Sequence, residues 1–343
     1  MRAVAALDWE ATVTRAEHEG LAPILYVAVR GGGAPAPVLA RLRSAWLDSE
    51  RRRLLATSQL REIIAAFGRA GLSAIVVNGP ALAAACYPDP ALRPFTHLTL
   101  VIRRGDRARA RDVLATLGDG PGRSESSRLP VDLRWECVRH LGGGRLTDVV
   151  SEEIWSRSVP AGEWGDGART LAPEDLVVHL ATEVAALGLG GGLAELDLAL
   201  VLERHGATLD WDAIGARARR WRAAAAVYFA LRAVADRLGI TAPSPTVHRL
   251  YPGELRVALM DRLQQAGPVP AARREWLIRL VMLDRASDAV RALAAELLGP
   301  DGAVRWRTLL AAYLKQVARA LAAAARTISM PGPRGRGGRA IVC

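Results

Sequence analysis

Cysteine, aromatic residues and long apolar runs are all scarce in this chain of 343 residues. The three cysteines, Cys86, Cys137 and Cys343, are far apart and show no Cys-x-x-Cys spacing, so neither a disulfide framework nor a cysteine-based zinc site is supported. No uninterrupted apolar run reaches the roughly 18 residues that a membrane span needs. Asp8 and Glu10 lie where a secretory signal would be apolar. We therefore expect a globular protein of the reducing cytoplasm.

Lysine is almost absent, since Lys315 is the only one, and arginine supplies nearly all of the positive charge. The net charge is +11 and the isoelectric point is about 10.7, a balance that is typical of nucleic-acid-binding proteins. The excess of alanine, glycine, proline and arginine also indicates a compositional bias of the source genome. Such a bias distributes arginines along the chain without forming a binding site. We favour a solvated arginine surface over specific nucleic-acid binding.

Hydrophobic periodicity divides the chain into four parts. It predicts an α+β protein in which a small mixed-sheet core is flanked by N-terminal helices and a helical C-terminal region. The parts are a helical lead-in over 1–70, an α/β core over 71–148, a helical region over 149–330 and a disordered basic tail over 331–343. Short basic, glycine-rich tails contact RNA weakly and without specificity.

The most informative stretch is the beginning of the core, from Val76 to Ile102. An apolar, β-branched run at 74–77 predicts a strand, and the Asn-Gly dipeptide that follows predicts a turn. Pro80 suits the first turn of a short helix over 81–86. That helix ends at the Tyr-Pro-Asp-Pro segment because proline cannot donate a backbone hydrogen bond. Residues 98–102 predict the next strand.

A later strand, predicted over 129–138, carries further polar side chains. Alternation places Asp132, Arg134 and Glu136 on one face of this strand and Trp135 on the other. A carboxylate beside an arginine forms a self-neutralising pair. Arg134 is also suited to bind phosphate without a metal, and the sequence leaves both interpretations open. Beyond this strand, residues 159–167 are expected to form a turn-rich loop.

These segments resemble the core motif of the uncharacterised nucleotidyltransferase family of the polymerase-β-like superfamily. The family pattern is roughly LKG-x-x-L, YPDP-x-LRP, an Asp-x-Asp-Leu-Leu-Val strand and a later Val-Asp-Leu-His-Trp strand. This chain has NGPAL at 78–82, YPDPALRP at 87–94, a strand ending at Val101 and VDLRW at 131–135. Asp197 and the Leu-Asp-Trp helix start after Thr208 also match. The resemblance implies a nucleotidyltransferase-like core that moves a nucleoside monophosphate from a nucleoside triphosphate to an acceptor, using Mg²⁺ or Mn²⁺.

The same resemblance shows where the chemistry differs. His97 and Thr99 stand at the positions of the two metal-binding aspartates of the family, and Asn78 stands at the position of its lysine. Glu183 lies about where a histidine is usual. Of the three expected carboxylates only Asp132 is present, so it is at most the one metal ligand. Because Mg²⁺ prefers hard oxygen ligands, an imidazole and a hydroxyl are poor substitutes.

Two hypotheses follow, and whether the chain is an enzyme stays open between them. In the first, the family fold is retained without transfer chemistry, and the chain is an accessory protein that binds a nucleotide, a peptide or a protein partner. A role in natural-product biosynthesis is implied because relatives are often encoded beside genes for peptide natural products. In the second, an active transferase recruits other carboxylates such as Asp89 or Glu136, or uses His97 with Mn²⁺. The candidate residues are Asp132, His97 and Thr99 at the catalytic positions, and Asn78, Gly79, Pro80, Arg93 and Arg134 for nucleotide binding.

Two other features carry less weight. His179 and Glu183 lie one helical turn apart, but their spacing is that of no recognised zinc site. The helix predicted over 303–328 has one basic and one apolar side. We expect its apolar side to pack against the protein, although such helices also bind anionic membranes or partner proteins.

Overall fold

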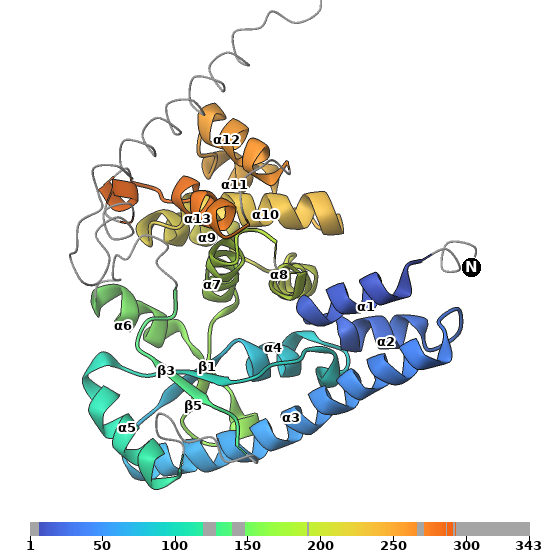
Figure 1. Ribbon diagram of the computed structural model, residues 1–343. Coiled ribbons are helices and arrows are strands. Elements are labelled where there is room, and N and C mark those ends of the chain that lie inside the picture. The colour runs from blue at the N-terminus through green and yellow to red at the C-terminus, as the bar shows by residue number, and fades with distance from the viewer. Residues whose placement is uncertain are drawn as a thin grey trace, which may run out of the picture.

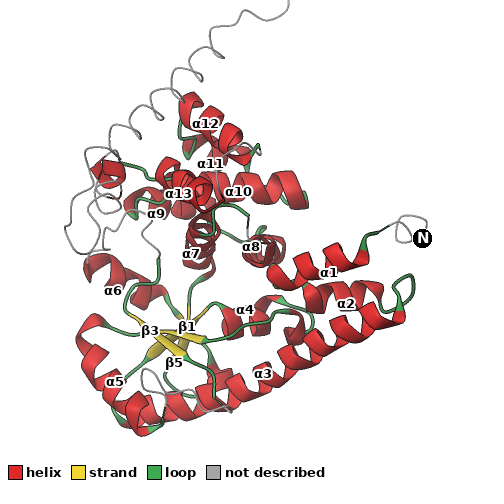
Figure 2. Ribbon diagram, in the orientation of Figure 1, coloured by secondary structure: helices red, strands yellow, loops and turns green. Residues whose placement is uncertain are grey.

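The computed structural model describes residues 7–118, 128–138, 148–190, 192–265, 271–285, 287–290 and 292. Within these residues, helices surround a single five-stranded sheet (Figures 1 and 2). The predicted α+β class, with a mixed sheet between an N-terminal and a C-terminal helical part, is confirmed. None of the described helices combines the length and apolarity that crossing a membrane requires.

Three helices form the lead-in, namely α1 (Trp9–His18), α2 (Ala22–Val29) and α3 (Ala36–Arg69). Asp8 caps α1 as predicted, because its carboxylate accepts a hydrogen bond from the N–H of Ala11 at 3.1 Å. Helix α3 has 34 residues, so at 1.5 Å per residue it is about 51 Å long. It runs beneath the sheet along the whole lower side of the molecule (Figure 1).

The strand order in the sheet is β3-β2-β1-β5-β4. The strands are β1 (Ala74–Val77), β2 (Leu98–Val101), β3 (Val131–Arg134), β4 (Val159–Pro160) and β5 (Ala168–Thr170). β1 is antiparallel to β2 and parallel to β5, while β2 is parallel to β3, so α5 (Arg107–Thr116) makes the crossover between β2 and β3. The register places Thr99 between Val77 and Asp132.

The two faces of the sheet pack against different helices because successive side chains of a strand point to opposite sides. One face packs on α3 and α5 through a buried cluster that includes Phe67, Val76, Leu98, Leu100 and Leu114. The opposite face packs under α4 (Gly79–Cys86) and α7 (Pro173–Ala186) through a second cluster that includes Ile75, Val77, Leu82, Val101 and Val177. Thr99 and Asp132 share this second face with the functional candidates.

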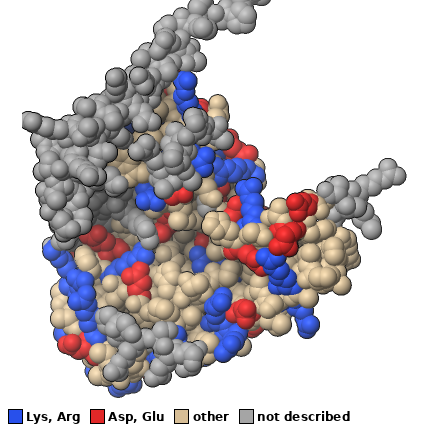
Figure 3. Space-filling model, viewed as in Figure 1, with Lys and Arg blue, Asp and Glu red and all other residues tan. Residues whose placement is uncertain are grey.

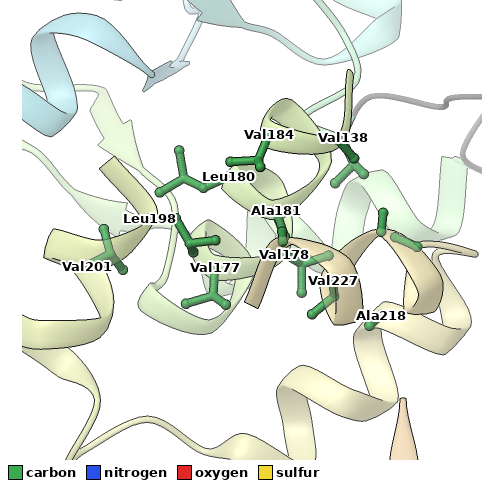
Figure 4. Close-up of a cluster of buried hydrophobic side chains, with 14 of the residues drawn as sticks. Val138, Val177, Val178, Leu180, Ala181, Val184, Leu198, Val201, Ala218 and Val227 are labelled. Atoms are coloured by element: carbon green, nitrogen blue, oxygen red, sulfur yellow. The ribbon is translucent and has the colours of Figure 1, made fainter. Parts of the chain in front are cut away.

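Helix α7 is the centre of the C-terminal helical part. Its buried side chains Val177, Leu180, Ala181 and Val184 lie among Leu198 and Val201 of α8 and Val227 of α10 (Figure 4). The other helices of this part are α6 (Asp148–Arg157), α8 (Gly192–His205), α9 (Trp211–Arg220), α10 (Ala224–Leu238), α11 (Ser244–Arg249), α12 (Glu254–Gln264) and α13 (Ala271–Val281). Single turns of 3-10 helix are η2 (Pro90–Leu92), η3 (Arg104–Asp106) and η4 (Gly162–Trp164).

The expected loop over 159–167 is only partly correct, because β4 and η4 lie in it and β5 follows directly. These strands have two and three residues, too few to show an alternating pattern. The pairing of β5 with β1, and of β4 with β5, decides their conformation. They also extend the sheet beyond residue 148. The predicted strand over 129–138 is shorter than expected. The helix over 303–328 and the tail over 331–343 lie outside the described residues.

Candidate functional site

A cleft of about 570 Å³ opens where the lead-in, the sheet and the C-terminal helices meet. In Figure 1 the ends of α1 and α2 face α8 and the start of α4 across this region. Its walls include Glu17, Asp48 and Arg52 from the lead-in, His97 from the edge of the sheet, and Glu183 and Leu193 from the C-terminal helices. The sequence does not indicate Glu17 and Asp48, because they share no motif with the core, and the run Arg51-Arg52-Arg53 predicts a solvated helix face more than a phosphate contact.

Asn78 lies at the floor of the cleft as the N-cap of α4. Its φ of 59° is unusual for a residue with a side chain, and asparagine tolerates it better than most. The Oδ1 atom of Asn78 lies 2.7 Å from Nε2 of His179, whose Nδ1 faces the carbonyl of Cys137. A carbonyl oxygen only accepts, so the ring of His179 donates to Cys137 through Nδ1 and lies with Nε2 against the side-chain amide of Asn78. This contact holds a neutral amide where the family has a lysine.

Gly79 and Pro80 form the first turn of α4, which therefore begins two residues before the predicted start at 81, and both are buried. Gly79 lies against Phe95 so closely that a Cβ atom at position 79 would be 2.8 Å from Cβ and from Cγ of Phe95. Because the Phe95 Cβ is fixed to its backbone, only glycine fits here without a shift. Gly79 and Phe95 line the cleft, so this contact sets the shape of its floor, whereas Pro80 is not among the lining residues.

Arg93 forms a nearly buried ion pair with Asp197 of α8. Nη2 of Arg93 lies 2.7 Å from Oδ2 of Asp197 and Nε lies 3.2 Å from Oδ1, while the Tyr87 hydroxyl donates to Oδ1 at 2.7 Å. The side chains of Arg93 and Asp197 are only 11% and 3% exposed. Burial, together with Asp197, raises the pKa of Tyr87, so its hydroxyl stays protonated. The Tyr-Pro-Asp-Pro segment is thereby fixed to α8, and the charge of Arg93 is already matched.

His97 lies partly exposed at the edge of the cleft. Partial desolvation lowers its pKa, and the charge of Asp132 opposes that shift only in part, so the imidazole is neutral at pH 7. Thr99, the second substituted position, is buried in the sheet at 1% exposure. Its hydroxyl finds no hydrogen-bond partner in the described part of the chain. The structure therefore brings His97 to the cleft and leaves Thr99 beneath its floor.

The guanidinium of Arg134 lies between two carboxylates. Nε of Arg134 is 2.6 Å from Oδ2 of Asp132 on the same strand, and Nη1 is 3.5 Å from Oε1 of Glu183 on α7. The predicted Asp132–Arg134 pair is thus formed, and it faces the cleft side of the sheet. A permanent cation stands between carboxylates that would otherwise repel one another.

The residues at the three metal positions do not fit a pair of magnesium ions. Asp132 is the only carboxylate among them, and Arg134 already matches its charge. Among the described residues, no three His, Cys, Asp or Glu side chains gather closely enough to hold a metal ion. His179 is engaged at both ring nitrogens by Asn78 and Cys137, so it is unsuited as a ligand together with Glu183.

The buried hydroxyl of Thr99 gives a test of its role. Thr99→Val replaces that hydroxyl with a methyl group of similar size, and we expect it to raise the free energy of unfolding by about 1 kcal/mol, because an unsatisfied polar group is removed. Urea denaturation of the two proteins measures this difference. A loss of stability would show instead that the hydroxyl makes a hydrogen bond, for example to a bound water molecule.

Comparison with known proteins adds one match. Residues 5–239 match a family described as uncharacterised nucleotidyltransferase. The matched residues make up more than half of the chain and include the lead-in, the whole sheet and the C-terminal helices as far as the end of α10. No curated protein and no solved structure matches the chain.

Proposed function

Because the chain belongs to the uncharacterised nucleotidyltransferase family, we propose that it binds a nucleotide in its cleft without metal-dependent transfer. The observation that carries this proposal is the position of Arg134 between Asp132 and Glu183. In an active member, carboxylates recruit Mg²⁺ to bind the phosphates. Here a guanidinium, whose charge the two carboxylates offset, stands at the same place and offers N–H donors.

The donors of Arg134 support phosphate binding. A guanidinium carries five N–H groups, and those directed at Asp132 and Glu183 leave others that can donate to the oxygens of a phosphate. His97 lies at the same edge of the cleft, and its neutral imidazole offers one N–H. Phosphate would therefore be held by hydrogen bonds and by the charge of an arginine.

The dimensions and the other walls of the cleft agree with a nucleotide. Its volume of about 570 Å³ lies within the range of small-molecule sites. Phe95, Leu180 and Leu193 offer apolar surface for a base, and Arg52 offers a second cation without an ion-pair partner in the described residues. Glu17, which also lines the cleft, is paired with Arg41 and does not repel phosphate with its full charge.

We expect binding of a nucleoside triphosphate to be independent of divalent metal. Calorimetric titration with ATP, GTP, CTP and UTP, each with EDTA, Mg²⁺ or Mn²⁺, measures this. Arg134→Gln should weaken binding about tenfold or more, which corresponds to ~1.4 kcal/mol. Arg219→Gln, on the exposed side of α9, is the control and should bind as the natural chain does.

Two outcomes would overturn this proposal. Release of pyrophosphate with Mg²⁺ or Mn²⁺, lost in Asp132→Ala, would establish an active transferase that uses the remaining carboxylate. The absence of binding to all four nucleotides, with and without metal, would leave a peptide or a protein as the ligand of the cleft.

We further propose that the protein is a cytoplasmic accessory component of peptide natural-product biosynthesis, on the strength of the family resemblance. Cys86 and Cys137 are free and buried, and burial raises the pKa of these thiols to about 11 and about 12. Both thiols are therefore protonated, as suits a reducing compartment. Affinity purification from the source cells tests the accessory role, and recovery of no biosynthetic enzyme or peptide would contradict it.

A further inference from the structure

A second hollow, of about 690 Å³, lies just beyond the C-terminal end of β3 and shares no lining residue with the cleft. It is bounded by η3, by the residue that follows β3 and by α6. The side chains that matter for its chemistry are Arg103, Arg104, Trp135, Glu152 and Trp155. In Figure 3 basic side chains follow the left edge of the molecule, where α5 lies in Figure 1.

Two arginines of this region have their guanidinium groups over tryptophan rings. Cζ of Arg103 is 4.4 Å from the ring centroid of Trp155, and Cζ of Arg107 is 4.1 Å from that of Trp135. Both distances are well within the range of cation–π contacts. Each contact holds its guanidinium against a ring, and Nε of Arg103 also donates to Glu152 of α6. These arginines are therefore placed by specific contacts.

The surrounding charge is mostly positive, and Glu152 of α6 offsets part of it by pairing with Arg103 at 3.3 Å. Five of the nine residues from Arg103 to Arg111 are arginines, and the one acid among them, Asp106, pairs with Arg109. Arg107 and Arg111 lie one turn apart on α5, about 6 Å along its axis. The Nε atom of Arg107 is buried and has no hydrogen-bond partner in the described residues. A row of cations thus extends from the hollow along α5.

We propose that this surface, the Arg/Trp face formed by Arg103, Arg104, Arg107, Arg111, Trp135 and Trp155, binds single-stranded nucleic acid. The arginines contact successive phosphates, and bases stack on the guanidinium planes that the tryptophans hold. A single small anion would need only one of these cations, whereas the row continues beyond the hollow. Unpaired bases are required because only they expose a flat face for stacking.

The test is fluorescence anisotropy of the full chain with a labelled oligouridine or oligothymidine of about 12 nucleotides, compared with a duplex of the same length. We expect binding to the single strands that falls steeply as salt rises from about 50 to about 200 mM. Replacing Arg103, Arg107 and Arg111 by glutamine should weaken binding about tenfold or more and reduce the slope of log K against log salt by about 2, since each phosphate contact contributes about 0.7.

Two control variants distinguish a specific binding site from nonspecific attraction by the positive charge of the surface. The triple replacement of Arg43, Arg51 and Arg69 by glutamine, all exposed on α3, removes the same charge and should leave binding nearly unchanged. Arg107→Lys keeps the charge but loses the planar guanidinium, so binding should weaken while the salt slope stays the same. All variants keep residues 331–343, so any contribution of that segment is common to them.

The proposal fails if both triple variants weaken binding equally, because diffuse charge alone would then explain it. It also fails if the natural chain prefers the duplex, or if it binds vesicles of anionic lipid while ignoring both single strands. Equal urea denaturation curves for the variants ensure that a loss of binding is not a loss of folding. Nucleotide titration of the cleft should be unaffected in Arg107→Lys, which keeps this inference separate from the proposed function.

Discussion

Replacing Asp197 by alanine is expected to lower the free energy of unfolding by about 3–5 kcal/mol, the usual cost of breaking a buried ion pair. The Asp197 side chain is 3% exposed and accepts hydrogen bonds from Arg93 and Tyr87. Its removal leaves the Arg93 charge buried without a partner and the Tyr87 hydroxyl without an acceptor. Urea denaturation with a linear extrapolation measures the loss.

Two further variants define the origin of that loss. Asp197→Leu combined with Arg93→Met removes both ions and should recover part of the stability, because no unpaired charge remains. Asp212→Ala removes a carboxylate of an exposed pair with Arg249 and should change stability little. If Asp197→Ala were as mild as Asp212→Ala, the Arg93–Asp197 pair would not hold the Tyr-Pro-Asp-Pro segment on α8.

Gly79→Ala is expected to lower the free energy of unfolding by about 1–3 kcal/mol, the range found for overpacking. Alanine is normally the better helix former, so helix propensity alone predicts the opposite sign. The cause is the contact with Phe95, whose Cβ and Cγ would both be 2.8 Å from the new methyl group. Since Phe95 must move, nucleotide binding in the cleft should weaken as well. Denaturation and calorimetric titration of one preparation measure both effects.

Gly68→Ala is the matched control. Gly68 lies in α3, and a Cβ there would approach no atom closer than 4.0 Å. The same substitution should therefore stabilise the protein, by about 0.5–1 kcal/mol. Stabilisation by both substitutions would mean that Phe95 yields without cost and that Gly79 is free to vary.

Local signals in the sequence predicted most of the elements that frame the cleft. The bounds of β1 agree with the prediction residue for residue, and Asp8 caps α1 as its position before the helix suggests. The strand alternation that places Asp132 beside Arg134 also holds, because a period of two needs only a few residues to be recognised. Each of these features is decided by neighbours in the chain.

The parts that escaped prediction depend on contacts between distant segments. Asn78 meets His179, and Arg93 meets Asp197, across more than 100 residues in each case. The family pattern names such residues but does not say which of them touch. The arginines of the Arg/Trp face resemble scattered charge in the sequence, and only the fold shows that Arg107 lies on Trp135.

Because successive side chains of a strand point to opposite sides, β3 and the residue after it contribute to two separate sites. Arg134 reaches Glu183 on α7, whereas the next residue, Trp135, lies under Arg107 of α5. A slip of one residue against β2 would exchange the two sides, sending an indole into the cleft and a guanidinium into a surface that is already strongly basic. The pairing of Thr99 with Asp132 therefore decides which side chains of this segment enter the cleft and which enter the Arg/Trp face, so a shift of a single position would disrupt both sites at once.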